Sequence, residues 1–381
     1  MSEAPNVKPV SISGDGSPNT SENSENSENS CIPKKVIIDP DGDLSLKVWE
    51  HGKFGWFQLK VSEPIILVVC SRTMSRASPV WKKLLYGGFA ESKQPCESGK
   101  AEWLVELPED NPRAMTTILN IIHSRFKYLP RVSESIGVND LYELTVLTDK
   151  YDLTTILRPW ATNWMEAMHK IRDSWSSPPF LITDLWRHIW IAWEMGDLEH
   201  LKRTAKQMIL YLPEDRLGMV KVGQQTSKPN NIGVLQPPGL EDVIKEGRLR
   251  SINGLLKLFQ DIINRLIAYP DTAGYKAVCS STGYISKDCE AYMLGVLIKS
   301  LSRAGLWPIP EASHYSQSMD NLRTTLKHLD VRNRFPYHSE CDPMPDRKTG
   351  IDKYINTVEV QLAENQLRHM EKQAKKSGLL S

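Results

Sequence analysis

The chain has 381 residues, of which 40% are hydrophobic and 24% are charged. This is enough material for two or three domains of roughly 100–200 residues with apolar cores. The formal net charge of +1 argues against a protein drawn to nucleic acid or to an anionic membrane by its overall field. The longest strongly apolar run, residues 65–70, is far shorter than the roughly 20 residues of a membrane helix.

The N-terminal region indicates a protein that stays inside the cell. It lacks the apolar core of a secretory signal, so we expect the six cysteines to be reduced thiols in the cytoplasm or nucleus. Residues 1–32 contain the polar repeat SENSENSENS and have almost nothing to bury. We therefore expect this leader to be disordered.

The first ordered stretch, DPDGDLSLKVWE, has two interpretations. Asp39, Asp41, Asp43 and Glu50 fall at positions one, three, five and twelve of a calcium-binding loop. Position six, however, is Leu44, where the sharp bend of such a loop needs glycine. The apolar and polar residues that follow alternate, as in a half-buried strand. We therefore expect an Asx-type turn that leads into a strand, and not a calcium site.

Hydrophobic periodicity predicts the remaining elements. Alternation indicates strands at 44–48, 53–61 and 101–110, and the apolar run 65–70 indicates another strand. Apolar residues three and four apart predict one helix across 71–86, ended by the glycine pair GG. Further helices are expected near residues 111–126, 139–147, 185–193, 198–211, 252–266, 286–304 and 322–329.

Four stretches, in this order, carry a family resemblance. They are the strand DLSLKVW, the helix SRASPVWKKLL with the turn GGFAES, the strand and helix WLVELPEDNPRAMTTILNIIHSRF, and the helix LYELTVLTDKYDL. Together they resemble the BTB/POZ domain over about residues 36–170. The stretch IILVVCSRTMSRASPVWKKLL is especially similar to filamentous-fungal BTB proteins. The chain departs from many BTB domains in having Pro64 and no histidine before the first core helix, and in an expanded loop from 50 to 63.

The resemblance implies an α+β fold, in which a BTB/POZ domain of mixed sheet and flanking helices is followed by an all-α C-terminal extension. We assign residues 33–172 to the BTB/POZ domain. The extension is expected to comprise a helical pair at 173–220, a linker or loop at 221–239, a helical region at 240–370 and a basic tail at 371–381.

The resemblance also implies a non-enzymatic protein that acts through protein–protein interaction, by forming a homodimer or by binding a protein partner. Trp49, Trp56 and the end of the helix at 81–91 are the expected contacts. The alternative is a substrate adaptor of a cullin-type E3 ubiquitin ligase. In such adaptors an apolar-x-Glu triplet docks the cullin scaffold, and here the triplet would be Phe89 and Glu91. The simpler reading is that Phe89 packs on its own helix end and Glu91 is solvated.

Four residues in the C-terminal half offer a set of metal ligands. Cys279, Cys289, His338 and Cys341 would together supply the Cys3His donors of a structural zinc ion. Only His338-x-x-Cys341 has the close spacing typical of a zinc knuckle. The alternative is a group of ordinary buried thiols with a surface histidine.

The sequence contains none of the GxSxG, Walker A, GxGxxG or HExxH motifs. The nine histidines have no spacing that suggests a catalytic pair, and the acids look like scattered solvated charge. We therefore expect no catalytic residues. Basic residues are too sparse for a nucleic-acid-binding surface, and neither nucleic acid nor a membrane is an expected partner.

Overall fold

The structure of this protein is a computed structural model. It describes residues 34–49, 53–54, 57–58, 64–92, 102–131, 133–175, 181–214, 233–268, 277–279, 284–331, 338, 341 and 344–380. The leader, Trp56, Glu50 and most of the expected linker lie outside these residues. Residues 34–381 belong to one compact unit, so the strand-containing part and the helices beyond residue 172 do not separate into two units.

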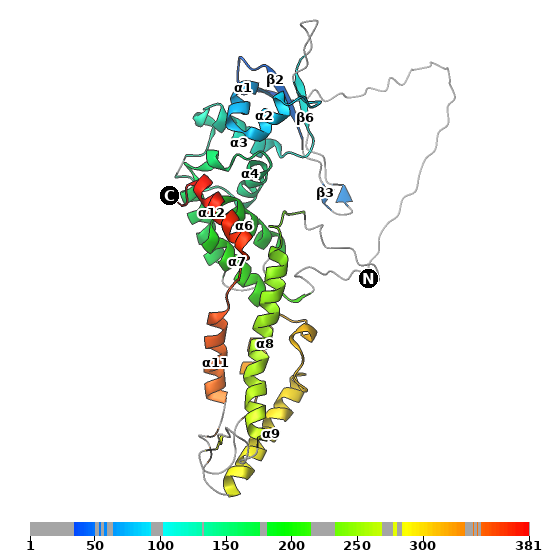
Figure 1. The fold of residues 1–381 in the computed structure, drawn as a ribbon, viewed down its shortest axis with the longest axis vertical. Coiled ribbons are helices and arrows are strands. Elements are labelled where there is room, and N and C mark those ends of the chain that lie inside the picture. The colour runs from blue at the N-terminus through cyan, green and yellow to red at the C-terminus, as the bar shows by residue number, and fades with distance from the viewer. Residues whose placement is uncertain are drawn as a thin grey trace, which may run out of the picture. The chain divides into compact units, whose positions relative to one another are not determined.

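The fold is α+β and mostly helical (Figure 1). The strands are β1 Lys34–Ile37, β2 Leu44–Val48, β3 Lys53–Phe54, β4 Phe57–Gln58, β5 Ile65–Val69 and β6 Leu104–Leu107. The α-helices are α1 Ser71–Ala77, α2 Pro79–Tyr86, α3 Pro112–Ile122, α4 Val138–Lys150, α5 Ala161–Asp173, α6 Ile182–Met195, α7 Leu198–Tyr211, α8 Leu240–Ile267, α9 Tyr284–Arg303, α10 Met319–Lys327, α11 Met344–Thr357 and α12 Glu364–Ser377. Short 3₁₀ turns are η1 Phe126–Tyr128, η2 Thr154–Leu157 and η4 Ala312–His314.

Four strands form a mixed sheet in the order β1-β5-β2-β6. β5 runs parallel to β1 and antiparallel to β2, and β2 runs parallel to β6. Leu46 lies opposite both Leu67 and Val105, and all three side chains are buried. These three side chains lie on one face of the sheet, and that face is in the core, as the alternating sequence pattern predicts.

The Asp-rich bend before β2 is a turn. The Asp41 N–H donates to Asp39 Oδ1 at 3.0 Å, which is the Asx turn expected from the sequence. Both carboxylate oxygens of Asp43 accept hydrogen bonds from Ser71, one from its N–H and one from its hydroxyl, at 2.8 Å each. Asp43 therefore ties the bend to the start of α1. Glu50, the twelfth position of the calcium loop, lies outside the described residues.

Two expectations about local structure are wrong. The helix expected across 71–86 is broken at Ser78, which has extended φ/ψ of −140° and 128° because the next residue is Pro79. Ser78 then caps α2 by accepting the Trp81 N–H at 3.0 Å. The strand expected at 53–61 is instead a separate pair, β3 and β4, in which Lys53 lies opposite Gln58.

The helix starts follow the capping residues only in part. Asn111 caps α3 by accepting the N–H groups of Arg113 and Ala114, with Pro112 at the first helical position. α4 begins earlier than expected: its N-cap is Gly137, and Asp140 lies within the first turn. The helices α7, α9 and α10 lie close to their expected positions, whereas α8 begins at Leu240, twelve residues before the expected start at 252.

The C-terminal helix returns to the middle of the chain. α12 packs against α6 and η2, and the two helices lie side by side in Figure 1. Gly196, at the end of α6, permits this approach, since it has a φ of 77° and an added Cβ would lie 2.1 Å from the Ala374 nitrogen. Residues 371–377, which we expected to begin a basic tail, form the second half of this packed helix.

Among the described residues, none of the helices combines the length and the apolar character that crossing a membrane requires.

Candidate metal centre and interaction surface

The four expected metal ligands come together. Cys289 lies on α9, Cys279 lies in the segment before α9, and His338 and Cys341 precede α11. Their ligand atoms all lie within 4.8 Å of one another, and all four residues are buried. The cluster could bind a metal ion.

The distances between donors fit a small tetrahedral site. The Cys279 Sγ lies 3.3 Å from His338 Nδ1 and 3.6 Å from Cys341 Sγ, and Cys341 Sγ lies 3.7 Å from His338 Nδ1. Metal–sulfur bonds of about 2.3 Å and metal–nitrogen bonds of about 2.0 Å in a tetrahedron give donor separations of about 3.5–3.8 Å. The donors therefore need only small shifts to surround one ion.

Local hydrogen bonds hold the ligands in place. The Cys341 N–H donates to the His338 carbonyl at 3.0 Å, and this turn brings the two side chains of the HSEC segment to one side. Oε1 of the buried Glu290 accepts the N–H groups of Val278 at 2.7 Å and Cys279 at 3.1 Å. Glu290 thus fixes the backbone that carries Cys279. His338 is also buried, so the expectation, in the alternative, of a histidine at the surface is wrong.

The expected partner-binding residues lie at the end of α2. Phe89 is 47% exposed and lines an open apolar hollow of about 460 Å³ together with Pro79, Val80, Lys83 and Leu84. The ring thus lies beside its own helix α2 with about half of its surface exposed. The Glu91 side chain is half-buried, and the Glu91 backbone carbonyl accepts the Trp103 indole N–H at 2.9 Å.

Of the other expected contacts, Trp49 is half-buried, with the Lys47 ammonium 5.1 Å from its ring centroid. Trp56 lies outside the described residues. The turn after α2 is held by Ser92, whose hydroxyl accepts the N–H groups of Gly88 and Phe89 and donates to the Leu84 carbonyl. These bonds fix the backbone of Phe89 while its side chain remains exposed.

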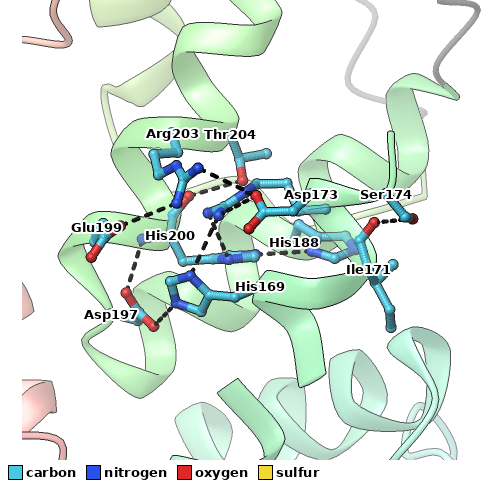
Figure 2. Close-up of polar contacts among 11 residues, drawn as sticks. His169, Ile171, Asp173, Ser174, His188, Asp197, Glu199, His200, Arg203 and Thr204 are labelled. Carbon is cyan, nitrogen blue, oxygen red and sulfur yellow. Dashed lines mark hydrogen bonds and ion pairs between the residues drawn. The ribbon is translucent and has the colours of Figure 1, made fainter. Parts of the chain in front are cut away.

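A buried histidine cluster was not foreseen. Arg172 of α5 is 1% exposed, and its guanidinium lies 3.2 Å from Nδ1 of His200 on α7. His200 Nε2 in turn lies 2.9 Å from Nδ1 of His188 on α6. Figure 2 shows His200 in line with His188, and His169 beside Asp197. The spacing of the histidines along the chain, which suggested no catalytic pair, gave no sign that these two meet in space.

The direction of each hydrogen bond in the cluster follows from Arg172, which can only donate. His200 therefore accepts at Nδ1 and donates from Nε2 to His188 Nδ1. His188 is left with an Nε2–H that has no hydrogen-bond partner in the described part of the chain. Burial and the nearby Arg172 charge lower the pKa of His188 to about 4. Burial and the positive charge of the groups around His200 lower the pKa of His200 to about 2. Both rings are therefore neutral near pH 7.

Besides Glu290, Asp110 and Glu194 are also buried, which corrects the expectation that the acids are solvated. Asp110 accepts the Tyr151 hydroxyl at 2.5 Å and the Lys150 ammonium at 2.6 Å. Burial and the Asp110 carboxylate raise the pKa of Tyr151. Glu194 of α6 accepts hydrogen bonds from Thr148, Thr154 and Gln373, and burial raises its pKa to about 7.

Comparison with known proteins adds no relative. The chain matches no family model, no curated protein and no solved structure.

Proposed function

We propose that this chain is a protein-interaction protein in which the strands and helices up to about residue 172 form a BTB/POZ domain and the later helices form an extension. In this proposal the domain binds a protein partner or a second copy of the chain and carries out no chemistry. The observation that carries it is the exposed Phe89 ring beside an apolar hollow, because a large exposed aromatic next to a pocket is typical of an interaction hot spot.

Contacts among the recognised stretches support the family part of the proposal. The indole of Trp81, from SRASPVWKKLL, stacks on the ring of Tyr151, from LTDKYDL, with centroids 4.4 Å apart. Ser78 donates its hydroxyl to the Tyr151 carbonyl, and Lys150 and Tyr151 both bond to Asp110 in the strand-to-helix stretch. The residues that suggested the resemblance are therefore the ones that hold the α/β part together.

The test compares full-length wild type with Phe89→Ala and with a matched control, Phe126→Ala. Phe126 is 60% exposed on η1, away from the α2 hollow in sequence. Light scattering reports self-association, and quantitative affinity purification from the native cell reports partners. We expect Phe89→Ala, and not Phe126→Ala, to reduce either self-association or partner binding. If both variants behave as wild type in both assays, the Phe89 surface is not an interaction site.

The alternative function is a substrate adaptor of a cullin-type ubiquitin ligase, with helices beyond residue 172 capturing the substrate. It is favoured by the Phe89-x-Glu91 triplet, in which Phe89 is exposed and Glu91 is half-buried. A pull-down of cullin by wild type that is lost in Phe89→Ala and in Glu91→Lys supports this function. Absence of cullin in the wild-type pull-down excludes it.

We also propose that the Cys3His cluster holds a structural zinc ion. Three thiolates and one imidazole suit zinc, and four protein ligands fill a tetrahedral site and leave no open position for a reaction. Thiolate ligands require reducing surroundings, in agreement with a cytoplasmic or nuclear protein. Metal analysis of purified protein by mass spectrometry tests this assignment: one zinc per chain is expected, and a metal-free protein contradicts it.

A further inference from the structure

The surface around the Phe89 hollow has a second property, its charge. On α2, Trp81 and Leu85 face the core, whereas Lys82 and Lys83 are exposed. Arg72 and Arg76 are exposed on the neighbouring helix α1. From Ser71 to Ala90 the sequence contains no acidic residue. The apolar hollow therefore lies along α2, which together with its neighbour α1 carries only positive charge.

Among the described residues these cations have no ion-pair partner. In the described ranges no ion pair involves Arg72, Arg76, Lys82 or Lys83, whereas Lys35 and Lys47 on the sheet pair with Glu102 and Glu106. Two acids lie near the ends of these helices, Asp43 before α1 and Glu91 after α2. The Asp43 carboxylate is bonded to Ser71, and Glu91 follows Phe89 at the end of the turn. The positive charge of this surface is thus largely uncompensated.

The charge distinguishes between two kinds of partner. If two copies met through this face, Lys82 and Lys83 of one copy would approach the same residues of the other, and like charges at an interface are unfavourable. An acidic segment would instead place carboxylates on the lysines while an apolar side chain entered the hollow. The partner that fits is therefore acidic and has an apolar anchor.

We propose that the face formed by α1, α2 and Phe89 binds an acidic segment of a partner protein, and that it is not the contact between two copies of this chain. This inference rests on the proposed interaction function and specifies the partner for the same surface. Phe89 and the hollow supply contact area, and Arg76, Lys82 and Lys83 select for negative charge.

Three synthetic peptides of about 16 residues test this proposal with the full-length protein. They share leucine and phenylalanine at i, i+3, i+4 and i+7, and carry glutamate, glutamine or lysine at the other positions. Fluorescence anisotropy measures binding at low and high salt. We expect the glutamate peptide to bind at least about tenfold more tightly than the glutamine peptide, with the difference shrinking in salt, and the lysine peptide to bind most weakly.

Variants separate the two parts of the surface. Replacing both lysines, Lys82→Gln with Lys83→Gln, should weaken the glutamate peptide by about tenfold and leave the glutamine peptide unchanged. Phe89→Ala should weaken both peptides by about tenfold or more. Lys372→Gln, an exposed lysine on α12, and Phe126→Ala serve as controls and should leave binding unchanged.

The outcomes distinguish this inference from the proposed function. Binding that depends on Phe89 but not on peptide charge overturns the acidic partner and leaves the interaction surface in place. A dimer in light scattering that Phe89→Ala dissociates and the double lysine variant strengthens assigns the face to self-association, and also overturns the inference. If no peptide binds, or Phe89→Ala changes nothing, the acidic partner is rejected together with the surface.

Discussion

The Gln373 side-chain amide donates a hydrogen bond to the Glu194 carboxylate at 2.5 Å, across 179 residues of chain. The same carboxylate accepts the hydroxyls of Thr154, on η2, and Thr148, on α4. Three elements thus meet at one buried acid. Ser377 of α12 adds a hydrogen bond to the Met195 carbonyl at 2.7 Å, so the C-terminal helix is held at the end of α6 by polar as well as apolar contacts.

The Glu194 carboxyl makes stability depend on pH. Its folded pKa of about 7 lies above the ordinary value of 4.5, so the folded state holds the proton more tightly. The contribution of Glu194 to the free energy of unfolding is fully present below pH 4.5 and is lost as the pH rises through 7. The change amounts to about 3 kcal/mol. Glu194→Gln should therefore reduce the loss of stability between pH 5 and 8, measured by urea denaturation. The exposed Glu199→Gln should behave as wild type, and an unchanged slope in Glu194→Gln would refute this role.

The histidine cluster has the opposite pH dependence. Because the His188 pKa of about 4 lies below its ordinary 6.5, the neutral ring contributes stability above pH 6.5 that is lost as the pH falls toward 4. About 2 kcal/mol should be lost by pH 5. His188→Gln should flatten the stability curve between pH 6.5 and 5, whereas His314→Gln, at an exposed site, should not. Equal slopes in wild type and His188→Gln would contradict the assignment.

Two glycine substitutions should have opposite effects. Gly196→Ala places a Cβ against the α12 backbone at a positive φ and should lower stability by about 2 kcal/mol or more, because α12 must shift. Gly295→Ala, within α9, meets no atom within 4 Å and should raise stability by up to about 1 kcal/mol. Thermal unfolding measures both. A stable Gly196→Ala variant would mean that α12 does not pack as closely as described.

Removing the proposed zinc ion should loosen the helices around the Cys3His cluster. With a strong chelator we expect a lower Tm and faster amide exchange in α9 and α11, while β2 and β5 keep their protection, since no ligand comes from the sheet. Cys289→Ser should have the same effect without chelator. Cys70→Ser, a half-buried cysteine outside the cluster, is the control. Protein that shows no response to chelator or to Cys289→Ser has no structural metal.

The sequence by itself determined most elements, because their signals are local. Hydrophobic period and capping residues located helices such as α7 and strands such as β2, and the donor types of Cys279, Cys289, His338 and Cys341 pointed to one metal site. The break at Ser78 is also encoded locally, by Pro79. The continuous apolar stripe across residues 71–86 nevertheless led us to predict a single helix.

Only the tertiary structure decided which distant residues meet. His188, His200 and Arg172 come from three helices, and Glu194 meets Gln373 only because α12 returns to α6. Neither contact can be predicted from the spacing of these residues along the chain. Whether a polar group is buried depends on how the helices pack and not on its neighbours in sequence. The same packing keeps Phe89 at the surface, where its exposure and the neighbouring lysines, which form no ion pair among the described residues, define the face that the proposed partner would bind.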